Sequence, residues 1–423
     1  MKRRAISILI LTALLAAVCC AAPAMVRVPC FPDLGPEDPR YPYVAELIRA
    51  GVLDGGAGKP FGGDQPVGWQ EAVTLLLRTI GAEWDGGPGE AAVEHKLLYT
   101  FDGAWPSGNP TRLEAAQMAA RGLDLLPFAG ESPYTDCHDG YVVKLYEKGL
   151  LEEKAEFRPE DPITRGELAM LAWRILHTDV TGGAFRYNNY WVEPLEGVPA
   201  FGYDTAAFRW EGGSPTYTGA GYTALRGVDV SGYQGDIDWE AVKAGGVDFA
   251  LVRVGGRFIN SGGLYDDSYF EKNVEGALAA GLQVGVYFFS QAINEEEGLE
   301  EAGYVLERIR DYDITMPVII DWEYLGGSDA RTYGVEPEKI TDGIEAFCRR
   351  VAEAGCDPMV YFNSYCGYVK MDLRRLADYG FWFAQYTEIP SFSYHFSMWQ
   401  YTNKGQMEGI SGDVDLNLYF LPD

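Results

Sequence analysis

The feature that most constrains the fold is a series of eight short apolar runs between residues 225 and 420, the first of which are separated by helical stretches. In order they read RGVDVSGYQ, DFALVRVGG, QVGVYFFSQ, MPVIIDWEY, DPMVYFNSY, YGFWFAQY, SMWQYT and DVDLNLYF. Continuously apolar strands alternating with helices such as YFEKNVEGALAAG predict a parallel barrel of the β/α type. After YFNSY the connections are too short for crossover helices, so we expect three final strands with little helical cover. The expected fold is an α/β, TIM-like but irregular (β/α)5β3 barrel.

Four acidic residues stand at the C-terminal ends of these predicted strands. Asp229 lies in the first strand, Asp321 and Glu323 lie in the fourth, and Asp415 lies in the last. Strand residues two apart share a face, and barrel sites lie at the C-terminal ends of the strands, so the four acids should converge. Crowded carboxyl groups repel each other unless they are used or bridged, which favours acid/base chemistry on a sugar.

Other roles for these acids compete with that interpretation. A lone aspartate such as Asp229 or Asp415 often serves as a helix cap or a turn former. Metal binding would also gather carboxylates, but no histidine lies among these strand-end acids. We therefore expect no metal and no other cofactor.

Aromatic residues occur near the same strand ends and suit the apolar C–H faces of pyranose rings. The candidate substrate-binding residues are Tyr287, Tyr361, Tyr386, Trp399 and, as a polar contact in the first run, Gln234. The sequence has no GxSxG elbow and no glycine-rich phosphate loop. A carbohydrate substrate is thus favoured over an ester or a nucleotide.

Length and charge limit the class of protein further. The 423 residues, 47% of them hydrophobic, are enough for two or three domains with sizeable cores. The chain has 34 Lys and Arg against 62 Asp and Glu, a formal net charge of −28. Because a polyanion is bound through clustered Lys and Arg, this charge excludes nucleic acid as a partner.

The N-terminus predicts export. Residues 1–24 have a basic start, an apolar run and a small-x-small site, which is typical of a signal peptide cleaved after Ala24. A lipoprotein cysteine at Cys19 or Cys20 is the alternative, although the usual leucine three residues earlier is missing. No other segment is long and apolar enough to span a bilayer, so we expect no membrane contact after cleavage.

Five cysteines remain after this cleavage, and they are scattered without a Cys-x-x-Cys pair. They are Cys30, Cys137, Cys348, Cys356 and Cys366. This pattern fits neither a disulfide framework nor a zinc site and favours buried or free thiols.

An internal repeat fills the N-terminal part of the chain. Three segments align, FGGDQPVGWQEAVTLLLRTI from Phe61, WPSGNPTRLEAAQMAARGL from Trp105 and FRPEDPITRGELAMLAWRIL from Phe157. In each, an aromatic residue precedes a proline by five positions and a helix follows, which in the third copy begins with a capping box of Thr164 and Glu167. The apolar face of that helix should carry Leu168, Leu171, Ala172, Ile175 and Leu176.

These segments resemble the S-layer homology repeats of bacterial envelope proteins. The expected module is all-α, with repeats over 28–82, 83–130 (degenerate) and 131–178. In that family the module binds an acidic secondary cell-wall polysaccharide, and the motif arginine falls here on Arg165 and Arg112. The first copy has no arginine at this position. The alternative is that both arginines only form ion pairs with neighbouring acids.

A segment rich in Gly, Pro and aromatic residues, 179–222, follows the repeats and shows no sustained period, so we expect a linker. Its aromatic side chains either pack on a neighbouring domain or offer stacking faces to sugars, and we favour packing.

Residues 225 to 420 resemble the glycoside hydrolase family 25 lysozymes, which are muramidases. The matching motifs are GVDVSGYQGDIDW, DDSYFEKNVEGALAAGLQVGVYFF, IIDWEY and the closing WQYT with GISGDVDLN. The resemblance implies a catalytic barrel over 223–423 in which Glu323 protonates the glycosidic oxygen. Asp321 is then its partner, and Asp229 and Asp415 are the family's first-strand and last-strand acids. One departure is Phe288, where the family commonly has a histidine.

Two rival functions are weighed against this one. Chitinases of family 18 also end a fourth strand in Asp-x-Glu, but their longer signature has Asp-Gly and another Asp upstream, where this chain has Met316, Pro317 and Ile319. A non-catalytic, lectin-like wall-binding protein would not need the intact Asp321 and Glu323 pair. Neither rival explains the carboxyl groups as well as a muramidase does.

The sequence thus predicts a secreted, wall-anchored muramidase that hydrolyses the β-1,4 bond between N-acetylmuramic acid and N-acetylglucosamine. Its partners would be peptidoglycan glycan strands and a secondary cell-wall polysaccharide. Carboxyl separations of about 5 to 5.5 Å and about 6.5 to 9.5 Å mark retaining and inverting enzymes, and residues two apart on a strand fit either. Resemblance to substrate-assisted hydrolases implies that Asp321 orients the 2-acetamido group and that the product keeps its β configuration.

Overall fold

The computed structural model describes residues 31–56, 58–211 and 213–423. The predicted signal peptide, the two cysteines considered for lipidation and Cys30 lie outside these residues. The other four mature cysteines are free thiols, and Cys137, Cys348 and Cys366 are buried. The predicted buried or free state is confirmed for these four.

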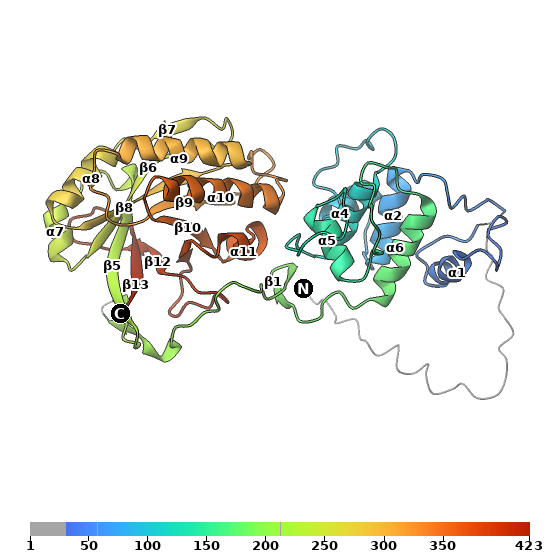
Figure 1. The fold of residues 1–423 in the computed structure, drawn as a ribbon, viewed down its shortest axis with the longest axis horizontal. Helices are drawn as coiled ribbons and strands as arrows, with labels where there is room; N and C mark the ends of the chain where they lie inside the picture. Colours follow the sequence, from blue (N-terminus) through green and yellow to red (C-terminus); the bar gives the residue numbers. More distant parts are fainter. Residues whose placement is uncertain (1–30, 57, 212) are drawn as a thin grey trace.

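The N-terminal module consists of six helices joined by loops (Figure 1). They are α1 (Tyr41–Arg49), α2 (Trp69–Thr79), α3 (Pro88–Glu94), α4 (Arg112–Gly122), α5 (Gly140–Glu147) and α6 (Arg165–His177). Helix α6 begins at the predicted capping box, in which Thr164 accepts from the Glu167 amide and Glu167 accepts from the Thr164 amide. Four of the five predicted face residues are buried, whereas Leu176 is 41% exposed because it lies at the solvent edge of the last turn.

The linker is more regular than predicted. It forms two hairpins, β1 (Phe185–Tyr187) with β2 (Tyr190–Val192) and β3 (Phe208–Glu211) with β4 (Ser214–Tyr217). Strands of three or four residues are too short to show a period of two, so the sequence did not reveal them. The predicted packing role is confirmed, since Tyr203, Phe208 and Tyr217 are buried and their rings pack in tilted and edge-on contacts against one another and against Phe420.

The C-terminal part of the chain is a closed eight-stranded barrel. Its strands, in the order of pairing, are β5 (Tyr222–Val230), β6 (Phe249–Arg257), β8 (Gln283–Ser290), β9 (Val318–Trp322), β10 (Pro358–Asn363), β11 (Gly380–Ala384), β12 (Met398–Gly405) and β13 (Val414–Pro422), which returns to β5. Strand β7 (Leu264–Asp266) adds to β6 as an antiparallel hairpin that the sequence did not predict.

One strand departs from the expected parallel arrangement. The last strand, β13, runs antiparallel to both β12 and β5, while the other barrel pairs are parallel. The connection from β12 to β13 is too short for a crossover and allows only a hairpin return. The barrel is therefore mixed, and it closes through this reversed strand.

Helices cover the barrel unevenly, and this follows the connection lengths. They are α7 (Trp239–Ala244), α8 (Phe270–Ala279), α9 (Glu295–Ile309), α10 (Pro337–Glu353) and α11 (Leu373–Leu376). The long α9 and α10 lie side by side on the outer face (Figure 1). After β10, the described residues add only α11 and a π-helical turn, η4 (Cys366–Lys370).

The buried side chains divide into an inner and an outer layer around the strands. In β9, Val318, Ile320 and Trp322 face the helices, while Ile319 belongs to the cluster inside the barrel. Asp321, two residues further, takes the same inward direction. The alternation thus carries an acidic side chain into the upper end of the barrel interior.

The helical module touches the barrel at the start of α10. The Tyr99 hydroxyl donates to Glu336 Oε1 over 2.8 Å, and the Tyr333 hydroxyl donates to the Tyr99 carbonyl over 3.0 Å. Arg121 lies 3.5 Å from the same Glu336 carboxylate. These contacts join the two halves independently of the linker.

Candidate active site

A cavity of about 740 Å³ opens at the C-terminal ends of the parallel barrel strands, and all four predicted acids line it. Asp415 lies at the N-terminal end of its strand and not at the predicted C-terminal end, and it reaches the cavity because β13 runs in the opposite direction. Asp229 and Asp415 are directly paired across the antiparallel strands β5 and β13. Asp321 is the second-last residue of β9, and Glu323 comes directly after the strand's last residue, Trp322. The structure therefore brings together four carboxyl groups that lie up to 186 residues apart in the chain.

Burial raises the pKa of the Asp229 carboxyl well above its usual range, and the neighbouring Asp415 charge adds to this rise. Two amides oppose the rise, because Asn417 Nδ2 and Gln400 Nε2 donate to Asp229 Oδ2 over 2.7 and 3.1 Å. The pKa of Asp415 is also raised, mainly by burial. The pair is thus suited to share a proton.

Burial and neighbouring charge also raise the pKa values of Asp321 and Glu323, the two acids at the end of β9. Burial, then the charges of Glu323 and Asp229, raise the pKa of Asp321 far above its ordinary value, and the Arg253 guanidinium opposes this rise. The pKa of Glu323 is raised by burial and by Asp415, against a hydrogen bond with Asp321. Carboxyl groups in this state can hold a proton at a pH where ordinary acids have lost theirs.

One oxygen of this group lacks a partner. Asp321 Oδ1 is buried and has no hydrogen-bond partner among the described residues. A buried acceptor without a donor costs about 1 to 3 kcal/mol, so such an atom at a cavity wall suits a donor on a ligand.

Two strand amides that the sequence analysis missed organise the acids. Gln400 Oε1 accepts from the hydroxyls of Tyr361 and Tyr386 over 3.2 and 2.9 Å, while its amide donates to Asp229. Asn417 Oδ1 accepts from the Trp382 indole over 2.8 Å. The available signal was a polar residue between two apolar neighbours in each strand, at even spacing from Asp415 in the case of Asn417.

The predicted aromatic residues are only partly placed at the cavity. Tyr287, Tyr361 and Tyr386 line it, as does Gln234, whose Oε1 accepts from the Ser231 amide over 2.9 Å. The prediction for Trp399 is wrong, because this side chain points out of the barrel, is fully buried and packs on Phe208. Its neighbour Gln400 faces inward instead.

Trp382 and Arg253 are further cavity residues that the sequence analysis did not single out. The Trp382 ring lies 4.6 Å from that of Tyr361, and Arg253 forms an ion pair of 2.7 Å with the buried Asp267. Phe288, in contrast, is fully buried on the outer face of the barrel against Tyr304. The departure noted at this position therefore lies in the packing and not in the cavity wall.

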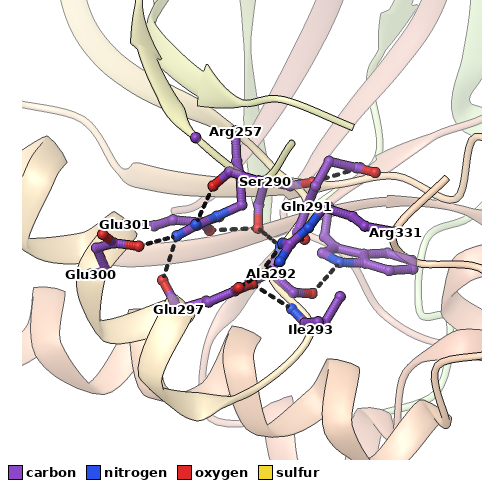
Figure 2. A network of polar contacts seen from close by, with 12 residues as sticks. Arg257, Ser290, Gln291, Ala292, Ile293, Glu297, Glu300, Glu301 and Arg331 are labelled. Carbon is purple, nitrogen blue, oxygen red and sulfur yellow. Dashed lines mark hydrogen bonds and ion pairs between the residues drawn. The ribbon is translucent and has the colours of Figure 1, made fainter. Parts of the chain in front are cut away.

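A buried polar network supports the end of β9 (Figure 2). Gln291 Nε2 donates to the Glu323 carbonyl over 2.8 Å, and the Trp322 indole donates to the Ala292 carbonyl over 3.0 Å. Arg331 donates to the Gln291 carbonyl over 2.6 Å and pairs with Glu297 over 2.5 Å. The segment after β8 thus fixes the backbone on which Asp321 and Glu323 stand.

The deepest part of this network is an ion pair between Arg257 and Glu301. Glu301 is 0% exposed and Arg257 is 3% exposed, and their Nε and Oε1 atoms lie 2.6 Å apart. Ser290 Oγ donates to the other Glu301 oxygen over 2.5 Å, and Arg257 also reaches the Gly262 carbonyl and Glu300. The pair joins β6, the end of β8 and α9.

In the helical module, the two motif arginines each join one repeat to another. Arg165 makes a two-pronged contact with Glu71, of 2.6 and 2.9 Å, and donates to the Phe61 carbonyl over 2.7 Å. Arg112 forms an ion pair with Glu167 and donates to the Phe157 carbonyl over 2.6 Å. The ion pairs considered as the alternative role are therefore present.

A cavity of about 260 Å³ lies beside Arg112 but does not include Arg165. Its charged lining is balanced, with the cations Arg40, Arg112, Lys154 and Arg174 and the acids Asp64, Glu152, Glu156 and Glu167. In the first repeat, Trp69 occupies the arginine position and is 8% exposed. Its buried indole nitrogen has no partner among the described residues.

Comparison with known families matches both halves of the chain. A model of the glycosyl hydrolases of family 25 matches residues 228–410, and a model of the S-layer homology domain matches residues 31–67 and 136–169. The two S-layer homology matches lie within the predicted first and third repeats. Asp229, Asp321 and Glu323 lie within the family 25 match, and Asp415 lies just beyond it.

Similar proteins include lysozymes. Lysozyme M1 of Streptomyces globisporus is 30% identical over 211 residues, which are 47% of this chain and 68% of that protein. The autolytic lysozyme of Clostridium acetobutylicum is 27% identical over 195 residues, which are 46% of this chain and 55% of that protein. Among solved structures, a bacterial lysozyme from Streptomyces coelicolor is 26% identical with a TM-score of 0.38, covering 47% of this chain and 92% of that one.

Proposed function

The chain belongs to glycosyl hydrolase family 25 and is a muramidase, and from this premise we propose that it is secreted, held at the cell wall and cleaves peptidoglycan glycan strands. The bond attacked is the β-1,4 linkage between N-acetylmuramic acid and N-acetylglucosamine. The observation that carries the proposal is the single cavity lined by Asp229, Asp321, Glu323 and Asp415, whose pKa values are all raised. A protonated carboxyl group at neutral pH is what cleavage of a glycosidic bond requires.

Each acid then has a separate task. Glu323 protonates the leaving oxygen, and Asp321 orients the 2-acetamido group, whose N–H is a donor for the unpaired Asp321 Oδ1. Asp229 and Asp415 hold the sugar and the nearby charges. Tyr287, Tyr361 and Tyr386 offer ring surfaces to the pyranoses, and Gln234 is a polar contact at the rim.

A wall-lysis assay tests this function against its rivals. The full chain should clear purified bacterial walls in a zymogram, and borohydride reduction of the products should label new N-acetylmuramic acid ends. Labelled N-acetylglucosamine ends would favour the chitinase-like alternative. Binding to walls without any lysis would favour the lectin-like alternative.

The stereochemical outcome is a specific prediction of the acetamido role. The acetamido oxygen displaces the leaving group and water then displaces the acetamido oxygen, so the first product should have the β configuration. Proton NMR of early products from a soluble glycan measures this. An α-anomer as first product would mean that water attacks directly and that Asp321 has another task.

The proposed location of the protein at the cell wall rests on two features of the N-terminal part of the chain. Residues 1–24 carry the features of a signal peptide, and the S-layer homology repeats belong to a class of module that binds cell-wall polysaccharide. Within the described part of the chain, every helix is too short or too polar to traverse a bilayer. We propose that the repeat module binds the secondary cell-wall polysaccharide and that Arg112 and Arg165 contact it.

The structure changes how strongly each of the two arginines is expected to contribute to wall binding. The sequence favours Arg165, in the repeat nearest the family pattern, but only Arg112 lines the module's cavity. Arg112→Ala should therefore weaken co-sedimentation with purified walls by about tenfold, the value of a charge-assisted hydrogen bond, and Arg165→Ala by less. Hydrolysis of soluble glycan should not change.

Arg158→Ala is the matched control for this experiment. Arg158 is an arginine of the third repeat that also contacts Glu167, but its side chain is 53% exposed and lies outside the cavity. It should sediment as the wild type does. Unaltered sedimentation of the Arg112 and Arg165 double variant would refute the assignment.

A further inference from the structure

One residue that lines the active-site cavity comes from outside the barrel. Tyr187, in the linker hairpin of β1 and β2, is among the residues that line the cavity. The family 25 match begins only at residue 228, so this aromatic side chain is an addition that the linker makes to the site. The linker aromatics Tyr203, Phe208 and Tyr217, in contrast, are buried and do not line the cavity.

The hairpin is built to hold Tyr187 at its tip. Tyr187 pairs with Tyr190 as the last pair of the two strands, and Asn188 and Asn189 form the turn. Asn188 has a φ of 50°, a left-handed conformation that asparagine adopts more readily than most residues. The turn therefore ends the hairpin immediately after Tyr187.

Contacts on two sides fix the hairpin in place. Towards the helical module, Arg186 pairs with Asp124 over 2.7 Å, and Lys96 donates to the Asn189 carbonyl over 2.8 Å. Towards the barrel, the rings of Tyr187 and Phe185 lie 4.8 and 5.4 Å from that of Tyr368. A side chain held in this way loses little conformational entropy when a ligand covers it.

The neighbours of Tyr187 have the composition of a sugar contact. Asn363, the last residue of β10, and Ser364 and Tyr365 after it line the same cavity, and the Tyr187 hydroxyl is hydrogen-bonded to Ser364. An aromatic face beside hydrogen-bonding groups matches the apolar and hydroxyl surfaces of a pyranose. None of these residues carries a carboxyl group, so they can bind a sugar but do not form a second catalytic site.

We propose that Tyr187 forms an additional saccharide-binding subsite, which takes a further pyranose of the glycan strand that the barrel acids cleave. This rests on the proposed muramidase function and adds to it a preference for long strands. The linker is then part of the binding surface and not only a connection. A long strand gains a contact that a short one cannot reach.

Kinetics on peptide-free glycan strands tests the subsite in the full chain. Tyr187→Ala should raise KM for long strands by about fivefold to tenfold more than KM for a tetrasaccharide, with kcat for long strands nearly kept. Tyr187→Phe keeps the ring and should stay close to the wild type. Phe185→Ala removes the other hairpin ring on Tyr368 without touching the cavity and should keep the wild-type ratio of the two KM values.

The outcomes separate this inference from the function on which it rests. Wild-type protein that cleaves neither substrate would contradict the muramidase function. Wild-type cleavage with equal KM changes for both lengths in Tyr187→Ala would overturn the subsite alone. The same length-dependent loss in Phe185→Ala would also overturn it, since the effect would then follow hairpin displacement and not a contact by Tyr187.

Discussion

Glu323→Gln is expected to fold as the wild type does and to lose about a hundredfold to ten-thousandfold of its wall-lysing activity. The glutamine has the same shape as the acid, and the Glu323 carbonyl, which Gln291 holds, is unchanged. What disappears is the proton that the leaving oxygen needs. The initial rate of hydrolysis of a soluble glycan measures the loss of activity. Near-normal hydrolysis would contradict the role of Glu323 as the general acid.

Two controls accompany this variant. Glu408→Gln changes an exposed glutamate of the same barrel that lies outside the cavity, and it should keep full activity. In the wild type, the raised pKa of Glu323 keeps the acid protonated above pH 4.5, the ordinary value. The fall of kcat/KM on the alkaline side should therefore begin above that pH, and the residual activity of Glu323→Gln should not show this fall.

The second large effect concerns stability and the network of Figure 2. Glu301→Ala should lower the free energy of unfolding by about 3 to 5 kcal/mol, because it leaves the Arg257 charge buried without its inner partner. Glu300→Ala removes the other carboxylate that contacts Arg257. Because the Glu300 side chain is 56% exposed, this variant should change the free energy of unfolding by less than about 1 kcal/mol. Denaturant unfolding of both variants tests this, and equal losses would contradict it.

The pH dependence of stability gives an independent measure of Glu301. Burial raises the pKa of Glu301 from 4.5 to about 7. The native state thus binds this proton more tightly than the unfolded chain, so the contribution is fully present below pH 4.5 and is lost as the pH rises through 7. Glu301→Gln stays uncharged, and its free energy of unfolding should fall less over this range than that of the wild type.

The position of the acids was predictable because it depends on local periodicity. Asp321 and Glu323 follow an apolar run, and a spacing of two places them on one face wherever that strand lies. The capping box at Thr164 and Glu167 is likewise a matter of adjacent residues. Such features need only the strand or helix in which they stand.

When a strand is buried on both faces, its sequence does not predict which of its side chains face the cavity. In β12 both Trp399 and Gln400 are buried, so their polarity does not reveal which of the two faces the cavity. The ring of Trp399 has the apolar face that suits a sugar, but in the barrel it packs on Phe208, and Gln400 donates to Asp229. Only the register with β11 and β13 decides this.

Periodicity and caps act over a few residues, so the alternation of strands and helices, the repeat and the acidic strand ends are visible in the amino-acid sequence. In contrast, the contacts of Arg165 with Glu71, of Arg257 with Glu301 and of Tyr187 with the cavity appear only in the packed fold. These contacts join residues between 44 and 94 positions apart or whole modules. Their physical reason is complementary charge and shape between packed surfaces, and no local pattern encodes which surfaces will meet.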